Sequence, residues 1–165
     1  MPDLDLFQPL DPLAALGRLP SGIYILTARN PDSTQSTGML ASWVQQAGFQ
    51  PPMLTVAVGK DRFVLDWIRT TGRFALNQVP AGRKDLLKHF GKGFGPDEPA
   101  FVGLEKVSER PIVLADASTF LEVETRNEVL SGDHVILLCE VVGGGVRSGG
   151  EVEPMIHVRR SGSNY

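Results

Sequence analysis

Residues 120–142, FLEVETRNEVLSGDHVILLCEVV, contain the clearest structural pattern in the chain. Residues 120–129 alternate between apolar and polar side chains, as a strand with one buried face does. The turn-forming sequence Ser131-Gly132-Asp133 follows, and residues 135–142 are mostly apolar. Two such runs joined by a short turn that contains glycine predict a long antiparallel β-hairpin.

Further short apolar runs on both sides of this hairpin predict more strands. They are bounded by clusters of Gly, Pro, Asn and Ser, which favour turns. The runs lie at residues 23–27, 39–44, 53–58, 74–79 and 155–160. Three consecutive glycines at residues 143–145 are interpreted as a turn, because no helical pattern follows them as it would in a phosphate-binding loop.

Helical periodicity is limited to two short segments, residues 61–71 and 83–90. The prolines of residues 1–20 leave room only for a short turn around residues 13–19. Six or seven strands without regular βαβ alternation predict a mainly β fold: an antiparallel, Greek-key-like barrel with short helical insertions. A doubly wound nucleotide-binding fold is disfavoured.

Composition narrows the class of protein. The 165 residues are enough for one domain, and 16 Lys and Arg are interspersed with 19 Asp and Glu, which argues against a nucleic-acid partner. No apolar run approaches the roughly 18 residues of a membrane span, and the N-terminus lacks a basic signal sequence. The single cysteine, Cys139, excludes an internal disulfide and a thiolate metal cluster. We expect a cytoplasmic protein with no metal site and no membrane partner.

Several segments, in this order, resemble the flavin-reductase-like, FMN-binding split-barrel family. They are PSGIYILTA at residues 20–28, GMLASW at 38–43, Pro51-Pro52, FALN at 74–77 and SGDH at 131–134. The resemblance covers residues 16–165 and leaves residues 1–15 as an N-terminal arm. It is closest to the C-terminal flavin reductase module of cyanobacterial flavodiiron proteins. The resemblance implies an FMN-binding split β-barrel.

The resemblance also implies which backbone lies along the flavin. The segment consists of Gly38, Met39, Leu40, Ala41, Ser42 and Trp43. Its N–H and C=O groups would bond the ring edge, and the serine would add a hydroxyl. An ordinary buried strand would explain the apolar members equally well.

The phosphate of FMN is expected at Val58, Gly59, Lys60 and Arg62. A strand end followed by a helix start offers backbone donors, and the two cationic side chains could join them. Typical members have a Ser-x-Thr at residues 60–62, so this chain departs from the pattern there. The alternative is that both cations are solvated turn charges, with Asp61 as a helix cap.

Four more residues resemble family positions beside the flavin or the nicotinamide. Asn77 ends a strand and can donate and accept hydrogen bonds. His89 and Phe90 would neighbour the flavin, and His134 would orient the nicotinamide during hydride transfer. Each also has an ordinary structural explanation: a turn asparagine, a helix-terminal histidine with its neighbouring ring, and a strand-start histidine.

The implied function is that of an NAD(P)H:flavin oxidoreductase. FMN would be the cofactor, NADH or NADPH the substrate, and the electrons would pass to a partner redox protein or to a free acceptor. A homodimer is expected, as in this family. Two other hypotheses stay open: an FMN-binding electron carrier or storage module without efficient NAD(P)H oxidation, and a structural subunit without cofactor.

Overall fold

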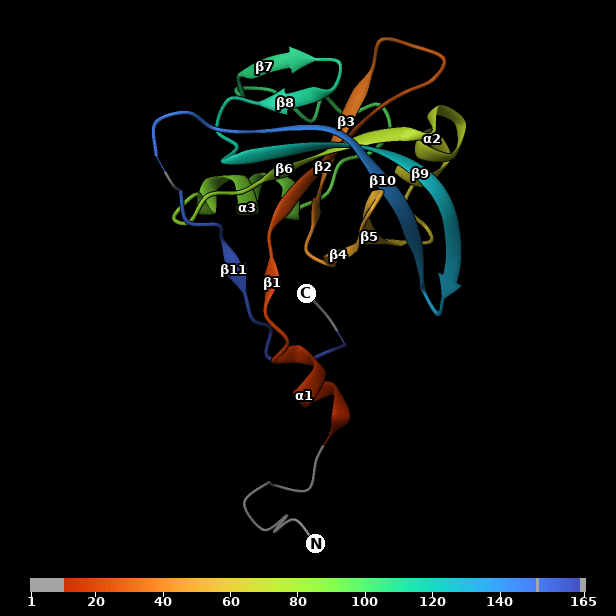
Figure 1. Ribbon diagram of the computed structural model, residues 1–165, viewed down its shortest axis with the longest axis vertical. Helices are drawn as coiled ribbons and strands as arrows, with labels where there is room; N and C mark the ends of the chain where they lie inside the picture. Colours follow the sequence, from red (N-terminus) through yellow and green to blue (C-terminus); the bar gives the residue numbers. More distant parts are fainter. Residues whose placement is uncertain (1–10, 151, 164–165) are drawn as a thin grey trace, which may run out of the picture.

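The chain folds around one seven-stranded antiparallel sheet (Figure 1). A computed structural model describes residues 11–150 and 152–163. The strand order is β3-β2-β6-β9-β10-β5-β4. The strands are β2 (Tyr24–Arg29), β3 (Ser36–Ala41), β4 (Val44–Phe49), β5 (Pro52–Gly59), β6 (Arg73–Gln78), β9 (Thr119–Ser131) and β10 (His134–Val146). The predicted mainly β, antiparallel split-barrel fold is confirmed.

The long hairpin is present as predicted. Strands β9 and β10 pair from Ser131 with His134 to Thr119 with Val146, and Gly132 adopts the positive φ of 62° that the turn requires. The predicted turn at residues 143–145 was wrong, because these glycines continue β10. A Cβ at position 144 would lie 2.8 Å from the backbone oxygen of Phe120, so glycine permits the close approach of β9.

Two hydrophobic cores share strand β2. Leu26 and Ala28 face the larger core, which the barrel strands enclose. Ile23 and Ile25, from the segment that enters and begins β2, face the smaller core. Residues alternate between the two faces of a strand, and both faces of β2 are buried. This explains why its sequence is a largely apolar run and does not alternate with polar residues.

The two predicted helices each cover one core. Helix α2 (Val64–Thr71) contacts β2 and β6, buries its apolar side chains in the larger core and ends at Gly72, whose φ is +69°. Helix α3 (Lys84–Gly91) contacts β3 and contributes Leu86 and Phe90 to the smaller core. The spacing of four identified α2 because that helix has one buried face, and α3 was predicted from the glycine that follows it.

An extension below the sheet combines both ends of the described chain (Figure 1). Helix α1 (Pro12–Gly17) leads into β1 (Ser21–Gly22), which pairs with β11 (Ile156–His157). The expectation of only a turn was wrong because Pro12 occupies the helix start, where no N–H is needed, and Asp11 caps the helix. Helix α1 crosses the predicted boundary at residues 15 and 16.

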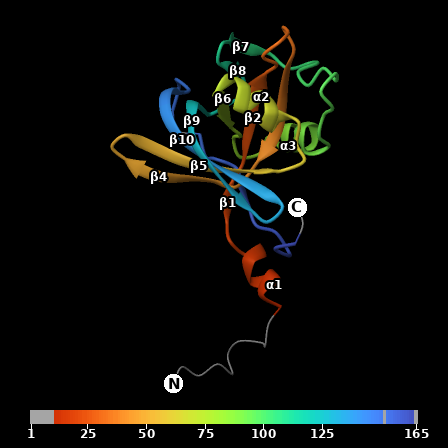
Figure 2. The ribbon, with the colours of Figure 1, turned by 90° about the vertical axis from the view of Figure 1, so that its right-hand side faces the viewer.

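Strands β4, β7 (Lys106–Glu109) and β8 (Ile112–Leu114) were not predicted, and neither was the two-residue β1. Strand β4 forms a hairpin with β5 that projects to one side (Figure 2), and strands β7 and β8 form a separate hairpin. The predicted run 39–44 is in fact interrupted at residues 42–43, where the chain leaves β3 before β4 begins. Within residues 11–150 and 152–163, no helix is long and apolar enough to cross a membrane.

Candidate functional site

Two predicted site segments meet where β5 ends and β10 begins. Gly59 is the pairing partner of His134, and Val58 is the partner of Val135. The N–H of Lys60 then donates to the backbone oxygen of Asp133 at 3.0 Å. The antiparallel register therefore places the proposed phosphate segment beside His134, the histidine that the family resemblance associates with nicotinamide.

Trp43 joins the same place from the connection between β3 and β4. Its ring centroid lies 4.7 Å from that of His134, with an angle of 46° between the planes. Its backbone oxygen accepts a hydrogen bond from the N–H of Ala57 at 3.0 Å. Ser42, the preceding residue, is buried. The structure thus brings together three predicted segments that are far apart in sequence.

A cation from the C-terminal segment completes this cluster, and sequence reasoning missed it. The guanidinium carbon of Arg159 lies 5.0 Å from the centroid of the Trp43 ring, within the range of a cation–π contact. We call Arg159, Trp43 and His134 the ring stack. No local pattern at Arg159 indicates this role, because its partner lies more than a hundred residues away.

His134 is oriented by its neighbour. Its Nδ1 lies 2.7 Å from the Asp133 carboxylate, which accepts a hydrogen bond when Nδ1 carries the proton. The hydrogen bond from His134, with its charge and that of Lys60, lowers the pKa of Asp133. The carboxylate is therefore ionised near neutral pH and fixes the imidazole.

Lys60 and Arg62 are both exposed, and neither side chain forms an ion pair or hydrogen bond within the described part of the chain. The N–H of Arg62 donates to the oxygen of Gly59 at 3.0 Å, which closes a tight turn. Phe63, not Asp61, is the N-cap of α2, and it makes no side-chain cap. The alternative role of Asp61 as the helix cap is therefore wrong.

Two glycines lie beside the Arg62 side chain. A Cβ on Gly59 would lie 3.6 Å from Cγ of Arg62, and a Cβ on Gly93 would lie 3.3 Å from its Nη1. Gly93 also has a positive φ of 75°, which disfavours other residues. The turn after β5 therefore lies beside the loop after α3, and the donor set of two cations and a turn backbone suits a phosphate.

The structure gives His89 and Phe90 mainly packing roles. Phe90 is 1 % exposed in the smaller core, where a Cβ on Gly38 would lie 2.5 Å from its Cε1. Gly38 therefore permits α3 to pack closely on β3. The Nε2 of His89 lies 2.8 Å from the backbone oxygen of Ala100, and its ring also neighbours Phe94. Neither side chain joins the ring stack.

Asn77 is committed to internal contacts. Its side chain is 1 % exposed, its Nδ2 donates to the oxygen of Ile112 at 3.1 Å, and its Oδ1 accepts from the N–H of Leu114 at 2.8 Å. These bonds hold β8 against β6. Contact of this amide with a flavin would require their loss, so we leave its side chain out of the proposed binding set.

The remaining predicted residues lie on the edge strand of the sheet. Residues 38–41 belong to β3, whose only strand partner within residues 11–150 and 152–163 is β2. An edge strand has backbone groups on its outer side that no ladder uses. This placement suits the expectation that backbone along Gly38, Met39, Leu40 and Ala41 bonds a ligand. The described residues contain no cluster of His, Cys, Asp and Glu that could hold a metal.

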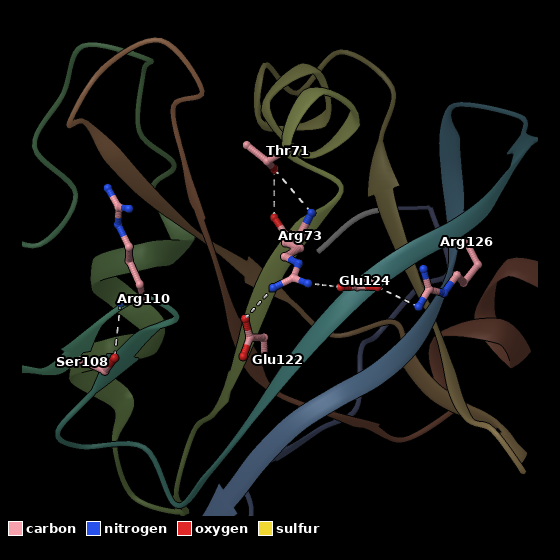
Figure 3. A network of polar contacts seen from close by, with 7 residues as sticks. All are labelled: Thr71, Arg73, Ser108, Arg110, Glu122, Glu124 and Arg126. Carbon is pink, nitrogen blue, oxygen red and sulfur yellow. Dashed lines mark hydrogen bonds and ion pairs between the residues drawn. The ribbon is translucent and has the colours of Figure 1, made fainter.

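A groove at the other end of α2 contains none of the predicted residues. It has a volume of about 460 Å³ and is lined by Arg29, Arg73, Arg110 and Glu122 among others. Figure 3 shows Arg73 between Glu122 and Glu124, with Arg126 on the far side of Glu124. This end is a network of ion pairs between β6, β9 and β10.

Comparison with known proteins agrees with the fold and identifies the family. Residues 16–164 match the family described as flavin reductase like domain. Diflavin flavoprotein A 1 of Synechocystis sp. is 38 % identical over 154 residues, which cover 92 % of this chain and 26 % of that protein. The chain thus spans about a quarter of the length of such relatives.

Solved structures resemble the whole fold. The NADH:FAD oxidoreductase SgcE6 of Streptomyces globisporus superposes with a TM-score of 0.80 at 24 % identity, covering 90 % of this chain and 91 % of that one. An FMN-binding protein of Thermus thermophilus has a TM-score of 0.76 at 20 % identity, with coverages of 92 % and 88 %. These similarities show the shared fold, and the family match over residues 16–164 shows that the chain belongs to the flavin reductase like domain family.

Proposed function

We propose that the protein is an FMN-dependent NAD(P)H:flavin oxidoreductase. The observation that carries the proposal is the meeting of the Lys60–Arg62 turn, the Trp43 ring and His134 at one place. Membership of the family establishes a flavin-type oxidoreductase domain, and the donors at this place suit a flavin nucleotide with one phosphate. When bound, FMN would accept a hydride from the nicotinamide and pass its electrons onward.

The residues have distinct proposed roles. Lys60 and Arg62 bind the phosphate by charge-assisted hydrogen bonds, helped by turn N–H groups. Backbone of β3 bonds the edge of the ring, and Trp43 forms one wall. His134, held by Asp133, orients the nicotinamide. In this role His134 would position the nicotinamide, and it would need to exchange no proton.

A carrier function is the second candidate, and a specific observation favours it. Typical family members have hydroxyl residues where this chain has Leu40 and Trp43, and here the large indole packs against His134. A ring in that position competes for the space that a nicotinamide would use. In this case the protein would hold FMN and exchange electrons with a partner, without efficient NAD(P)H oxidation.

The proposal also includes a homodimer or a partner redox protein, and a cytoplasmic location. Phe49 is 89 % exposed at the end of β4, and Leu130 is 71 % exposed near the tip of the β9–β10 hairpin. Such apolar tips support pairing with a second copy or with a partner redox protein. The single cysteine, Cys139, is buried and unpaired, which fits the reducing cytoplasm.

A visible spectrum followed by anaerobic NAD(P)H oxidation tests the proposal. We expect a yellow protein, or one that becomes yellow with added FMN, which bleaches when NADH or NADPH is added without oxygen. His134→Gln should slow bleaching while leaving FMN bound. A colourless protein that fails to bind FMN up to about millimolar concentration, roughly the limit of weak specific binding, would refute flavin binding. A yellow protein that bleaches with dithionite but not with either nicotinamide would identify the carrier.

A further inference from the structure

The C-terminal segment, residues 152–163, is attached to several parts of the body by backbone hydrogen bonds. The N–H of Met155 donates to the oxygen of Val79 at 2.8 Å, and the N–H of Arg159 donates to the oxygen of Gly17 at 2.9 Å. These anchors belong to the end of β6 and the end of α1. The segment is therefore tied to the core of the molecule on one side and to its N-terminal helix on the other.

The anchors continue beyond Arg159. The N–H of Gly162 donates to the oxygen of Leu13 at 2.5 Å, and a Cβ on Gly17 would lie 2.6 Å from the carbonyl carbon of Ser161. Glycine at both contact points lets the segment lie directly against α1. With the backbone held before, at and after Arg159, the starting point of its side chain is fixed in space.

The guanidinium of Arg159 lies against the face of Trp43, and His134 lies beside the same ring. Tryptophan offers a cation the strongest attraction of the aromatic side chains. The ring stack therefore joins the C-terminal segment, the connection between β3 and β4, and the start of β10. The cation limits the rotation of an indole that covers part of the proposed flavin site.

We propose that Arg159 is a positioning residue of the flavin site, which holds the Trp43 indole against His134. This proposal rests on the proposed function, since it requires that the site beside the Trp43 indole binds flavin. Arg159 acts through the ring wall, whereas Lys60 and Arg62 act on the phosphate. Loss of Arg159 should therefore weaken FMN and riboflavin equally.

We expect Arg159→Ala to weaken both flavins about tenfold, equivalent to ~1.4 kcal/mol. Arg159→Lys should retain most of the affinity, because an ammonium also engages an indole face. Arg160→Ala is the matched control. It removes the same charge from the adjacent, exposed residue, which contacts no aromatic ring among the described residues, and it should leave both affinities unchanged.

Fluorine NMR of protein labelled with 5-fluorotryptophan gives a readout that needs no flavin. The chain has two tryptophans, and Trp43→Phe and Trp67→Phe assign the two resonances. Arg159→Ala should shift or broaden the Trp43 resonance. The resonance of Trp67, which is buried in α2, should not change. Arg159→Gln, which keeps the aliphatic stem without the charge, repeats the test if the alanine variant fails to fold.

The outcomes separate this proposal from the proposed function. An unchanged Trp43 resonance together with unchanged riboflavin affinity in Arg159→Ala would overturn the positioning role. An equal effect of Arg160→Ala would overturn it as well, since it would reveal a general effect of charge. If the original protein binds neither flavin, the proposed function falls, and the Trp43 resonance still decides whether Arg159 holds the ring.

Discussion

The two ends of helix α2 differ in how their cations are paired. At its start, Lys60 and Arg62 have no ion-pair partner within the described residues. At its end, Arg69 and Arg73 are both engaged by carboxylates of β9. A phosphate can engage unpaired cations without first breaking ion pairs. The start of α2 is thus suited to bind an anion, whereas its end joins strands of the barrel surface.

The largest expected effect tests the start of α2, where the proposed phosphate site lies. Lys60→Ala combined with Arg62→Ala should weaken FMN by about two to four orders of magnitude, because each charge-assisted contact contributes roughly 1.5 to 3 kcal/mol. Riboflavin, which lacks the phosphate, should bind nearly as before. Fluorescence titration of both flavins measures the difference, and added salt should weaken FMN far more than riboflavin.

The matched control removes two charges from the other end of the helix. Arg69→Ala combined with Arg73→Ala should change FMN affinity less than about twofold, since eight helical residues span about 12 Å and charges beyond a Debye length of ~8 Å are largely screened. Equal losses in the two double variants would mean that a general field, and not a phosphate contact, attracts FMN. Equal loss of riboflavin and FMN in the first variant would place its two residues at the ring instead.

The next effect concerns Asn77, whose side chain lies in the interior and holds β8. Asn77→Leu should lower the free energy of unfolding by about 2 to 4 kcal/mol, because the oxygen of Ile112 and the N–H of Leu114 lose their buried partner. Urea denaturation measures the loss. Asn127→Leu, a control on the exposed part of β9, should cost less than about 0.5 kcal/mol. If Asn77→Leu left stability unaltered and greatly weakened FMN binding, the side chain of Asn77 would belong to the flavin site.

A smaller effect is expected from the ion pairs of the groove. Arg73→Ala should lower the free energy of unfolding by no more than about 1 kcal/mol, because the side chain is more than half exposed and water screens its pairs. Glu122→Gln combined with Glu124→Gln, which keeps the side-chain shapes, should have an effect of similar size. A loss as large as that of Asn77→Leu would mean that this network, despite its exposure, is essential to the barrel.

The smallest effect lies in the core between the two ends. Burial raises the pKa of Cys139 from 9.0 to about 11. The folded state therefore disfavours the thiolate, so this contribution to stability is complete below pH 9 and is lost as the pH rises toward 11. At pH 9 the loss is about 0.4 kcal/mol relative to Cys139→Ala, which cannot titrate. The rate at which Cys139 reacts with a disulfide reagent at pH 8 measures this burial. Equal rates in the folded and the unfolded protein would contradict it.

Local pattern predicted much of the fold. The period of two in residues 120–129 and the turn at Gly132 indicated the β9–β10 hairpin, and the spacing of Val64 and Ile68 indicated α2. Strand β8 was missed because its buried run is only three residues long, too short to show a period. Strands β4 and β7 were missed because their residues are exposed or only half-buried. Without a buried face, a strand leaves little periodic signal in sequence.

The sequence by itself determined the fold class and the family, because these depend on alternation, turn residues and ordered motifs, and it pointed to the segments of the proposed site. Only the tertiary structure decided how the segments combine. It placed Asn77 and Phe90 in the interior, set Trp43 against His134, and brought Arg159 to the ring from the other end of the chain. The physical reason is that a side chain's partners follow from strand register and from segments packed at long sequence separation, neither of which a local pattern contains.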